Sequence, residues 1–147
     1  MKKLSLFFAC SLIGMFSFAQ SMQDDHSAIA TTLNYYLEGG TNGDFETLKK
    51  AFHEDARMRY VRDGEFQDVN VLEFFGSRMK PGGKPANRET RIANIDIAGH
   101  AATARLEIVY PTFKFIDYMT LLKIDGNWLI VNKSFYREAI LAALPKE

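Results

Sequence analysis

Apolar residues recur at helical spacing in the first half of the chain and alternate with polar residues in the second half. A first helix is predicted over residues 24–40, with apolar positions at Ile29, Leu33, Tyr36 and Leu37. Asp24 and Asp25 suit its N-terminus, because carboxylates are favourable at the positive end of the helix dipole. Gly39 and Gly40 predict where this helix ends.

Shorter segments follow before the pattern changes. Residues 43–52 predict a second helix, for which Asp44 is the expected N-cap. Residues 69–79 predict a third helix. Residues 80–90 predict a loop, because prolines and glycines interrupt any regular pattern there.

Alternating apolar and polar residues then predict strands joined as hairpins. The three hairpins are expected over residues 56–69, 91–111 and 113–136, turning at Asp63–Gly64, near Gly99–His100 and at Asp125–Gly126 or Gly126–Asn127. Residues 137–147 predict a short helical or frayed tail. Helices followed by meandering strands predict an α+β fold, with the helices on one face of a curved antiparallel sheet.

Residues 1–19 have the pattern of a secretory signal peptide. Lys2 and Lys3 precede a short apolar run, and Ser17–Phe18–Ala19 offers small residues at a cleavage site. We therefore expect residues 20–147 to form a single domain that is exported, either to the periplasm or out of the cell. A retained membrane helix is one alternative, although spanning needs about 20 apolar residues. Lipidation of Cys10 is another.

Charge and cysteine content exclude several classes of function. The whole chain has 18 basic and 18 acidic residues, which gives no electrostatic signature of nucleic-acid binding. Because Cys10 lies in the predicted signal peptide, the mature domain has no thiol for disulfides, nucleophilic catalysis or metal ligation. The three histidines His26, His53 and His100 lack ligand spacing, so we expect no metal site. No cofactor is expected either.

Three strings carry a resemblance to a known superfamily: "FHEDARMRYVRDG" (52–64), "RIANIDIAGHAATARLEI" (91–108) and "FIDYMTLLKIDGNWLIVNKSF" (115–135). With the order of elements, they resemble the nuclear-transport-factor-2-like (NTF2-like) superfamily, and within it the putative lumazine-binding family. Ketosteroid-isomerase-like and polyketide-cyclase-like (SnoaL-like) proteins share the plan. The resemblance implies a cone-shaped sheet wrapped around the N-terminal helices, a central pocket and a homodimer.

The last hairpin places one carboxylate, Asp117, in an apolar run. Alternation puts Asp117 and Met119 on one face of the first strand. A two-residue turn would add to that face the even-numbered residues Trp128, Ile130, Asn132, Ser134 and Tyr136. A three-residue loop with a bulge would exchange the faces. The carboxylate must be paired, neutralised or used, because burying a lone charge is costly.

Two interpretations of Asp117 stay open. In the ketosteroid-isomerase group, the matching string carries a carboxylic acid that stays protonated and donates a hydrogen bond to the substrate. By that resemblance, Asp117 would be a catalytic acid or oxyanion donor. Alternatively, Asp117 is structural and pairs with Lys114, Lys133 or an arginine, or caps a backbone amide.

The isomerase base is missing. In that group a carboxylate serves as base on the first strand, and Tyr60 stands at its position here. Tyrosine is a poor base at neutral pH. Tyr60 would instead hydrogen-bond or stack on a ligand, or be an ordinary strand tyrosine. His53 is a second candidate base, unless the "HEDA" segment is a solvated turn.

These residues support two classes of function and a third alternative. The first is a binding protein for a flat, mostly apolar ligand, with the ligand-binding candidates Tyr36, Tyr60, Asp117, Met119, Trp128 and Asn132. The second is an isomerase, cyclase or dehydratase that uses Asp117 with His53 or a water. The third is a dimeric interaction domain without a pocket. We expect the locally basic segment to be solvated, with Arg78, Lys80, Lys84, Arg88 and Arg91.

Overall fold

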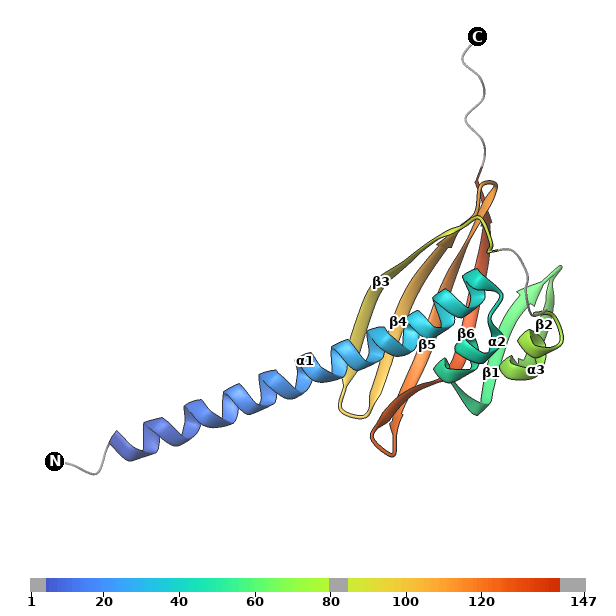
Figure 1. Ribbon diagram of the computed structural model, residues 1–147. Helices are drawn as coiled ribbons and strands as arrows, with labels where there is room; N and C mark the ends of the chain where they lie inside the picture. Colours follow the sequence, from blue (N-terminus) through green and yellow to red (C-terminus); the bar gives the residue numbers. More distant parts are fainter. Residues whose placement is uncertain (1–4, 80–84, 141–147) are drawn as a thin grey trace, which may run out of the picture.

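The computed structural model describes residues 5–79 and 85–140, and side chains from residue 22 onward. The helices are α1 (Ser5–Asn42), α2 (Phe45–Leu48), a 3-10 turn η1 (Lys49–Ala51) and α3 (Val71–Gly76). The strands are β1 (Phe52–Arg62), β2 (Glu65–Asn70), β3 (Glu89–Ala98), β4 (Ala101–Val109), β5 (Phe113–Ile124) and β6 (Asn127–Ala139). The predicted α+β cone fold is confirmed: helices cover one face of a curved, unclosed sheet (Figure 1).

The six strands form one sheet in the order β2-β1-β6-β5-β4-β3. All neighbours are antiparallel except β1 and β6, which run parallel, so the expectation of a purely antiparallel sheet is wrong at that pair. The predicted turns at Asp63–Gly64 and Asp125–Gly126 are confirmed. Both residues of each turn have positive φ, as a two-residue hairpin turn of this hand requires. β1 begins four residues earlier than the alternation predicts.

The β5–β6 pair contains an irregularity that decides which residues face the helices. The Cα partners change from Leu121↔Ile130 to Thr120↔Asn132, so Val131 is an extra residue in β6. Before this bulge, even-numbered residues of β6 share a face with Asp117. Beyond it, the odd-numbered residues Lys133 and Phe135 take that face. The two-residue turn is therefore right, but the predicted face is wrong for Asn132, Ser134 and Tyr136.

Helix α1 continues past the glycines that were expected to end it. It ends at Asn42, and Gly43 follows with a φ of +67°. Gly39 lies inside α1, at a point where the backbone of α2 packs closely against it. A Cβ at Gly39 would lie 2.8 Å from the Asp44 carbonyl oxygen and closer still to the Leu48 amide. This glycine therefore serves close packing between the two helices.

Gly39→Ala is expected to destabilise the protein. At an exposed helix site the change would stabilise by about 1 kcal/mol. Here the backbone of α2 must move, which costs on the order of 1–3 kcal/mol. The measurement is urea unfolding, with Asn34→Ala on the exposed face of α1 as control. A Gly39→Ala protein as stable as the wild type would show that α2 yields without cost.

The described chain begins with α1 and ends just after β6. The first part of α1, within the predicted signal peptide, projects beyond the sheet (Figure 1). Export and dimerisation stay predictions. The tail prediction is wrong for residues 137–139, which continue β6, and residues 141–147 lie outside the described chain. Within the described ranges, no helix is both long and apolar enough to cross a membrane.

Candidate functional site

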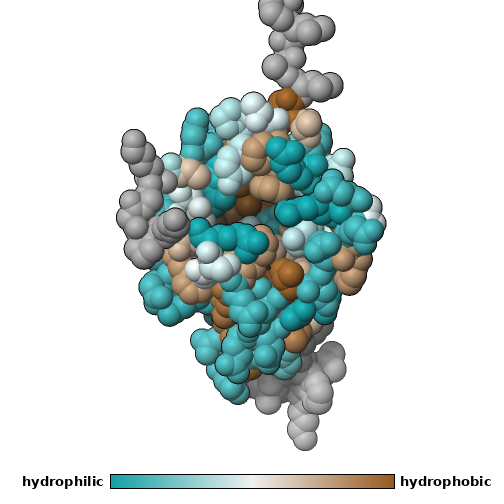
Figure 2. Space-filling view, turned by 90° about the vertical axis from the view of Figure 1, so that its right-hand side faces the viewer, coloured by the Kyte–Doolittle hydropathy of each residue, from teal (hydrophilic) through white to brown (hydrophobic). Residues whose placement is uncertain are grey.

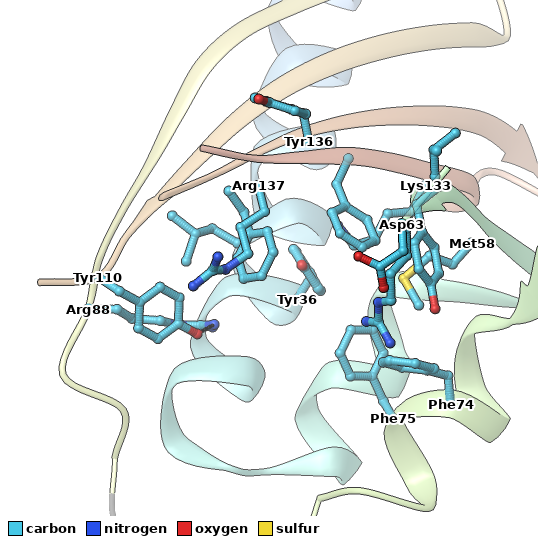
Figure 3. Close-up of a pocket in the computed structure, with 16 residues that line it drawn as sticks. Tyr36, Met58, Asp63, Phe74, Phe75, Arg88, Tyr110, Lys133, Tyr136 and Arg137 are labelled. Carbon is cyan, nitrogen blue, oxygen red and sulfur yellow. Dashed lines mark hydrogen bonds between the residues drawn. The ribbon is translucent and has the colours of Figure 1, made fainter. Parts of the chain in front are cut away.

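A cavity of about 550 Å³ lies between the sheet and helices α1 and α3. Eight of the sixteen residues that line it are aromatic: Tyr36, Tyr60, Phe74, Phe75, Tyr110, Phe115, Phe135 and Tyr136. Figure 2 shows a hollow with hydrophobic residues at its base and hydrophilic residues around it. In Figure 3, Arg88 and Tyr110 lie at one end of the cavity, Phe74 and Phe75 lie at the other, and Tyr36 lies between them.

The charged residues of the cavity wall are mostly cations. Arg62, Arg88, Lys133 and Arg137 contribute to the wall, against the single carboxylate of Asp63. All three arginines lie over aromatic rings. Arg62 lies 5.3 Å from the centroid of Tyr60, Arg88 lies 5.8 Å from that of Tyr110, and Arg137 lies 4.0 Å from that of Phe113. The cavity therefore favours ligands that carry an anionic or oxygen-rich group.

Three side chains from α1, β5 and β6 form a buried polar cluster beside the cavity, which we call the Tyr36–Asp117–Lys133 cluster. The Tyr36 hydroxyl donates to Asp117 Oδ2 at 2.7 Å, and Lys133 Nζ lies 2.6 Å from Asp117 Oδ1. Asp117 is fully buried, and 4% of Lys133 is exposed. Lys133 Nζ also lies 4.5 Å from the centroid of Phe135. The carboxylate thus lies behind the wall, while tyrosine and lysine form part of it.

Burial shifts the pKa of Tyr36 and of Lys133, the two residues of this cluster that line the cavity. Burial lowers the pKa of the Lys133 ammonium below its ordinary value, although the Asp117 carboxylate acts in the opposite direction. Burial, together with the charge of Asp117, raises the pKa of Tyr36 well above its ordinary value. Tyr36 therefore stays protonated and keeps its hydrogen bond to Asp117. Lys133 loses its proton more readily than an exposed lysine does.

Arg88 is a wall residue that the sequence placed wrongly in a solvated segment. Its Nε donates to Thr41 Oγ1 at 2.9 Å, Nη1 donates to Tyr110 Oη at 2.9 Å, and Nη2 donates to the Leu37 carbonyl at 3.0 Å. The last turn of α1 has no basic residue of its own. Arg88 brings a positive charge to that helix end, where it is favourable. It therefore ties α1 to the start of β3 at one end of the cavity.

Five of the six predicted ligand-binding residues divide into two groups. Tyr36 and Tyr60 line the cavity, and Asp117 lies directly behind it. Met119 and Trp128 lie in the core, outside the cavity wall. The indole of Trp128 donates to Asp25 Oδ1 at 2.9 Å, which fastens α1 to the β5–β6 hairpin. These two residues are therefore packing residues in this geometry.

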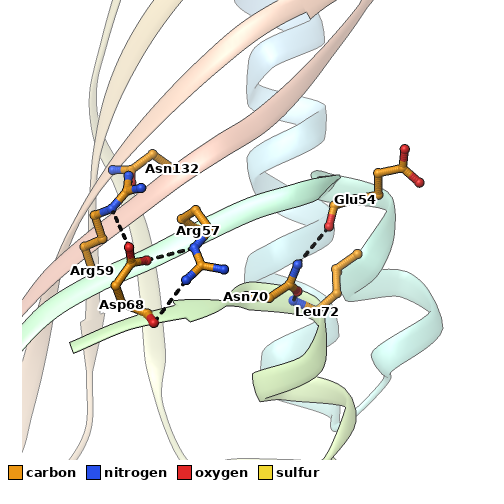
Figure 4. A network of polar contacts seen from close by, with 7 residues as sticks. All are labelled: Glu54, Arg57, Arg59, Asp68, Asn70, Leu72 and Asn132. Carbon is orange, nitrogen blue, oxygen red and sulfur yellow. Dashed lines mark hydrogen bonds and ion pairs between the residues drawn. The ribbon is translucent and has the colours of Figure 1, made fainter.

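Asn132 lies on the opposite face of the sheet, because the bulge at Val131 turns it away from the cavity. Its Oδ1 accepts from Arg59 Nη1 at 2.8 Å. Figure 4 shows it beside a surface network in which Asp68 pairs with Arg57 and Arg59. A direct ligand contact for Asn132 in this cavity is thus ruled out by its position.

His53, the candidate base, lies near the start of β1 and outside the cavity wall. Its Nδ1 accepts from the Asp55 amide at 3.1 Å, so it has a local structural role. The segment around it is part of the strand rather than a solvated turn. Among the residues that the structure describes, no three His, Cys, Asp or Glu side chains gather as a metal site.

The curved sheet, the covering helices and the cavity between them place this chain in the NTF2-like class of proteins. NTF2-like proteins of known structure from Shewanella baltica OS155 and Methylobacillus flagellatus KT superpose with TM-scores of 0.71 and 0.69. They are 30% and 36% identical, over 78% and 79% of this chain and 94% of theirs. The model of the family described as "Putative lumazine-binding" matches residues 24–136, and the chain belongs to that family.

The chain is also similar to a named enzyme. Aldolase FrzH from Cladobotryum sp is 26% identical to this chain over 117 residues, which cover 76% of this chain and 90% of the aldolase.

Proposed function

We propose that this protein binds a small, flat, unsaturated molecule in the cavity between α1 and the sheet. An anionic or carbonyl oxygen of that molecule would lie near Lys133. The observation that carries the proposal is an aromatic-walled cavity of about 550 Å³ with a buried ammonium in its wall. Such a volume is within the ~300–1,000 Å³ of typical small-molecule sites.

The aromatic wall favours a flat ligand. Tyr60 and Phe135 stack on each other, with their centroids 4.7 Å apart at an interplanar angle of 30°, and form one aromatic block of the wall. Tyr36 and Phe75 add a second pair with centroids 6.1 Å apart. Rings in such positions offer their faces to an unsaturated ligand in offset or edge-on contact. A pteridine such as lumazine, the compound in the family's name, has this flatness and two carbonyl oxygens.

Lys133 and Arg88 support the expectation of an oxygen acceptor. A lysine ammonium has three donors, and the ion pair with Asp117 leaves others for a ligand. Arg88 is held by three protein acceptors, so its charge stays at the cavity wall. Hydrogen bonds to charged groups in a water-poor site are stronger than in water. A neutral hydrocarbon would leave the remaining donors of Lys133 without an acceptor.

A second candidate function is an enzyme that acts on a carbonyl compound. The similarity to an aldolase favours it, together with the buried titratable groups of the Tyr36–Asp117–Lys133 cluster. Buried and mutually perturbed groups in a cavity are typical of active sites. In this function Lys133 and Asp117 would exchange protons with the ligand. Binding in the same cavity would precede the reaction, so both candidates share one first test.

The first test is a fluorescence titration of the purified protein with lumazine, riboflavin and 2-naphthoate. Saturable binding of at least one of these flat probes is expected. Tyr60→Leu should weaken that binding about tenfold, which equals about 1.4 kcal/mol. Tyr118→Leu is the matched control, because Tyr118 lies on the opposite face of the sheet with 53% of its surface exposed. It should leave the affinity unchanged.

Two results would contradict the proposal. If none of the three probes binds saturably to folded protein, the cavity does not hold flat unsaturated ligands. If Tyr60→Leu and Tyr118→Leu weaken binding equally, the probe binds elsewhere on the molecule. Thermal unfolding of each variant checks whether the substituted protein is still folded.

A further inference from the structure

We propose that Lys133 is an imine-forming amine, which captures the carbonyl carbon of an aldehyde or ketone held in the cavity. This inference rests on the proposed binding function and names its substrate class. It extends the role of Lys133 from an electrostatic contact to a covalent one.

The position of Lys133 is unusual for a lysine. Only 4% of the residue is exposed, yet it contributes to the wall of a cavity large enough for a small molecule. Its Nζ lies near the rings of Phe135 and Tyr36, at 4.5 Å and 5.6 Å from their centroids. Lysine is rarely buried unless it is paired or used. The cavity offers this amine a second role, contact with a ligand, beside its ion pair with Asp117.

The partner of Lys133 suits proton transfer. Asp117 Oδ1 lies 2.6 Å from Nζ and has no hydrogen bond of good geometry, whereas Oδ2 accepts from Tyr36. One carboxylate oxygen is therefore held in place while the other faces the amine. Burial lowers the pKa of Lys133, so the neutral, nucleophilic amine is more accessible than in an exposed lysine. This is the environment in which lysines act as Schiff-base amines.

The proposed step balances without any further reactant. Asp117 takes one proton from the Lys133 ammonium, the neutral Nζ adds to the carbonyl carbon, and one proton moves from Nζ to the carbonyl oxygen. The resulting carbinolamine loses its hydroxyl as water, with the proton that Asp117 returns. The products are a protonated imine and one water. Neither oxidant nor metal takes part, and the net charge of the reacting groups is the same before and after the reaction.

Reductive trapping tests the inference on the intact protein. The probe is 6-methoxy-2-naphthaldehyde, with sodium cyanoborohydride as the hydride donor that converts an imine to a stable secondary amine. Peptide mapping then compares Lys133 with Lys123. Lys123 also pairs with an aspartate, at 2.7 Å, but 29% of its side chain is exposed against 5% for Lys133. Labelling by simple accessibility would therefore favour Lys123.

Lys133 is expected to be labelled at least about tenfold faster than Lys123 in the folded protein. In urea the two lysines should react alike. Lys133→Arg keeps the positive charge beside Asp117 but cannot form an imine, and it should lose the fast adduct. Labelling of Lys133 no faster than that of Lys123 in the wild-type protein would overturn the inference, whatever the variant does.

A non-carbonyl analogue separates this inference from the proposed binding function. The alcohol (6-methoxy-2-naphthyl)methanol has the same ring system but cannot form an imine. If the alcohol binds and Lys133 stays unlabelled, the imine is refuted while the binding function holds. If neither aldehyde nor alcohol occupies the cavity, both proposals fail for this class of ring.

Discussion

Asp117→Ala is expected to lower the free energy of unfolding by about 3–5 kcal/mol, because it leaves a buried charge without its partner. Lys133 Nζ has Asp117 Oδ1 at 2.6 Å as its counter-ion, and both residues are buried. The Tyr36 hydroxyl also loses its acceptor. Urea unfolding at neutral pH measures the change.

A second variant distinguishes the lost charge pair from a simple cavity. Adding Lys133→Met to Asp117→Ala removes the unpaired ammonium, and most of the lost stability should return. The surface pair of Lys114 and Glu138 joins the same two strands and provides the control. Its side chains are 30% and 45% exposed, so Glu138→Ala should cost at most about 1 kcal/mol. Equal costs for Asp117→Ala and Glu138→Ala would contradict the buried-pair account.

Arg88→Met is the second substitution with a large expected effect, a loss of about 3 kcal/mol in unfolding free energy. Three side-chain nitrogens donate to Thr41, Tyr110 and the Leu37 carbonyl, and hydrogen bonds from a charged donor are worth roughly 1.5–3 kcal/mol each without full additivity. The last turn of α1 loses its positive partner as well. Amide hydrogen exchange should accelerate there before the rest of the domain is affected.

Arg91→Met is the matched control for Arg88→Met. Arg91 lies three residues after Arg88, in β3, and 66% of its side chain is exposed in its pair with Glu107. Its loss should change stability by less than about 1 kcal/mol and leave exchange in α1 unaltered. If Arg91→Met destabilises as much as Arg88→Met, the anchoring of α1 by Arg88 is not the cause.

Local signals were sufficient to predict most of the elements. The Asp44 N-cap, the Asp–Gly turns and the alternation in 91–111 and 113–136 each act over a few residues, and the structure shows all of them. The resemblance supplied the cone and its cavity. Tyr36 and Tyr60 could be predicted as interior residues, because large aromatic side chains at helical or strand spacing face the inside of the protein.

The remaining site residues depend on contacts between distant segments. Alternation assigns Asn132 to the face of Asp117, but the extra residue Val131 changes the assignment, and no glycine marks this bulge. The sequence names Lys133 as one possible partner of Asp117 without a reason to choose it. Arg88 lies among other basic residues after a loop, so its contact with the end of α1 has no local signal.

The bulge at Val131 divides the β5–β6 pair into two parts, and the two parts contact different regions of the protein. On the turn side, Trp128 and Ile130 pack in the core beneath α1. On the far side, Lys133 and Phe135 form cavity wall. Substitutions beyond the bulge can alter ligand preference, while the residues on the turn side of the bulge maintain the core. Proteins with this scaffold can therefore differ in the ligands they bind through a few residues beyond the bulge.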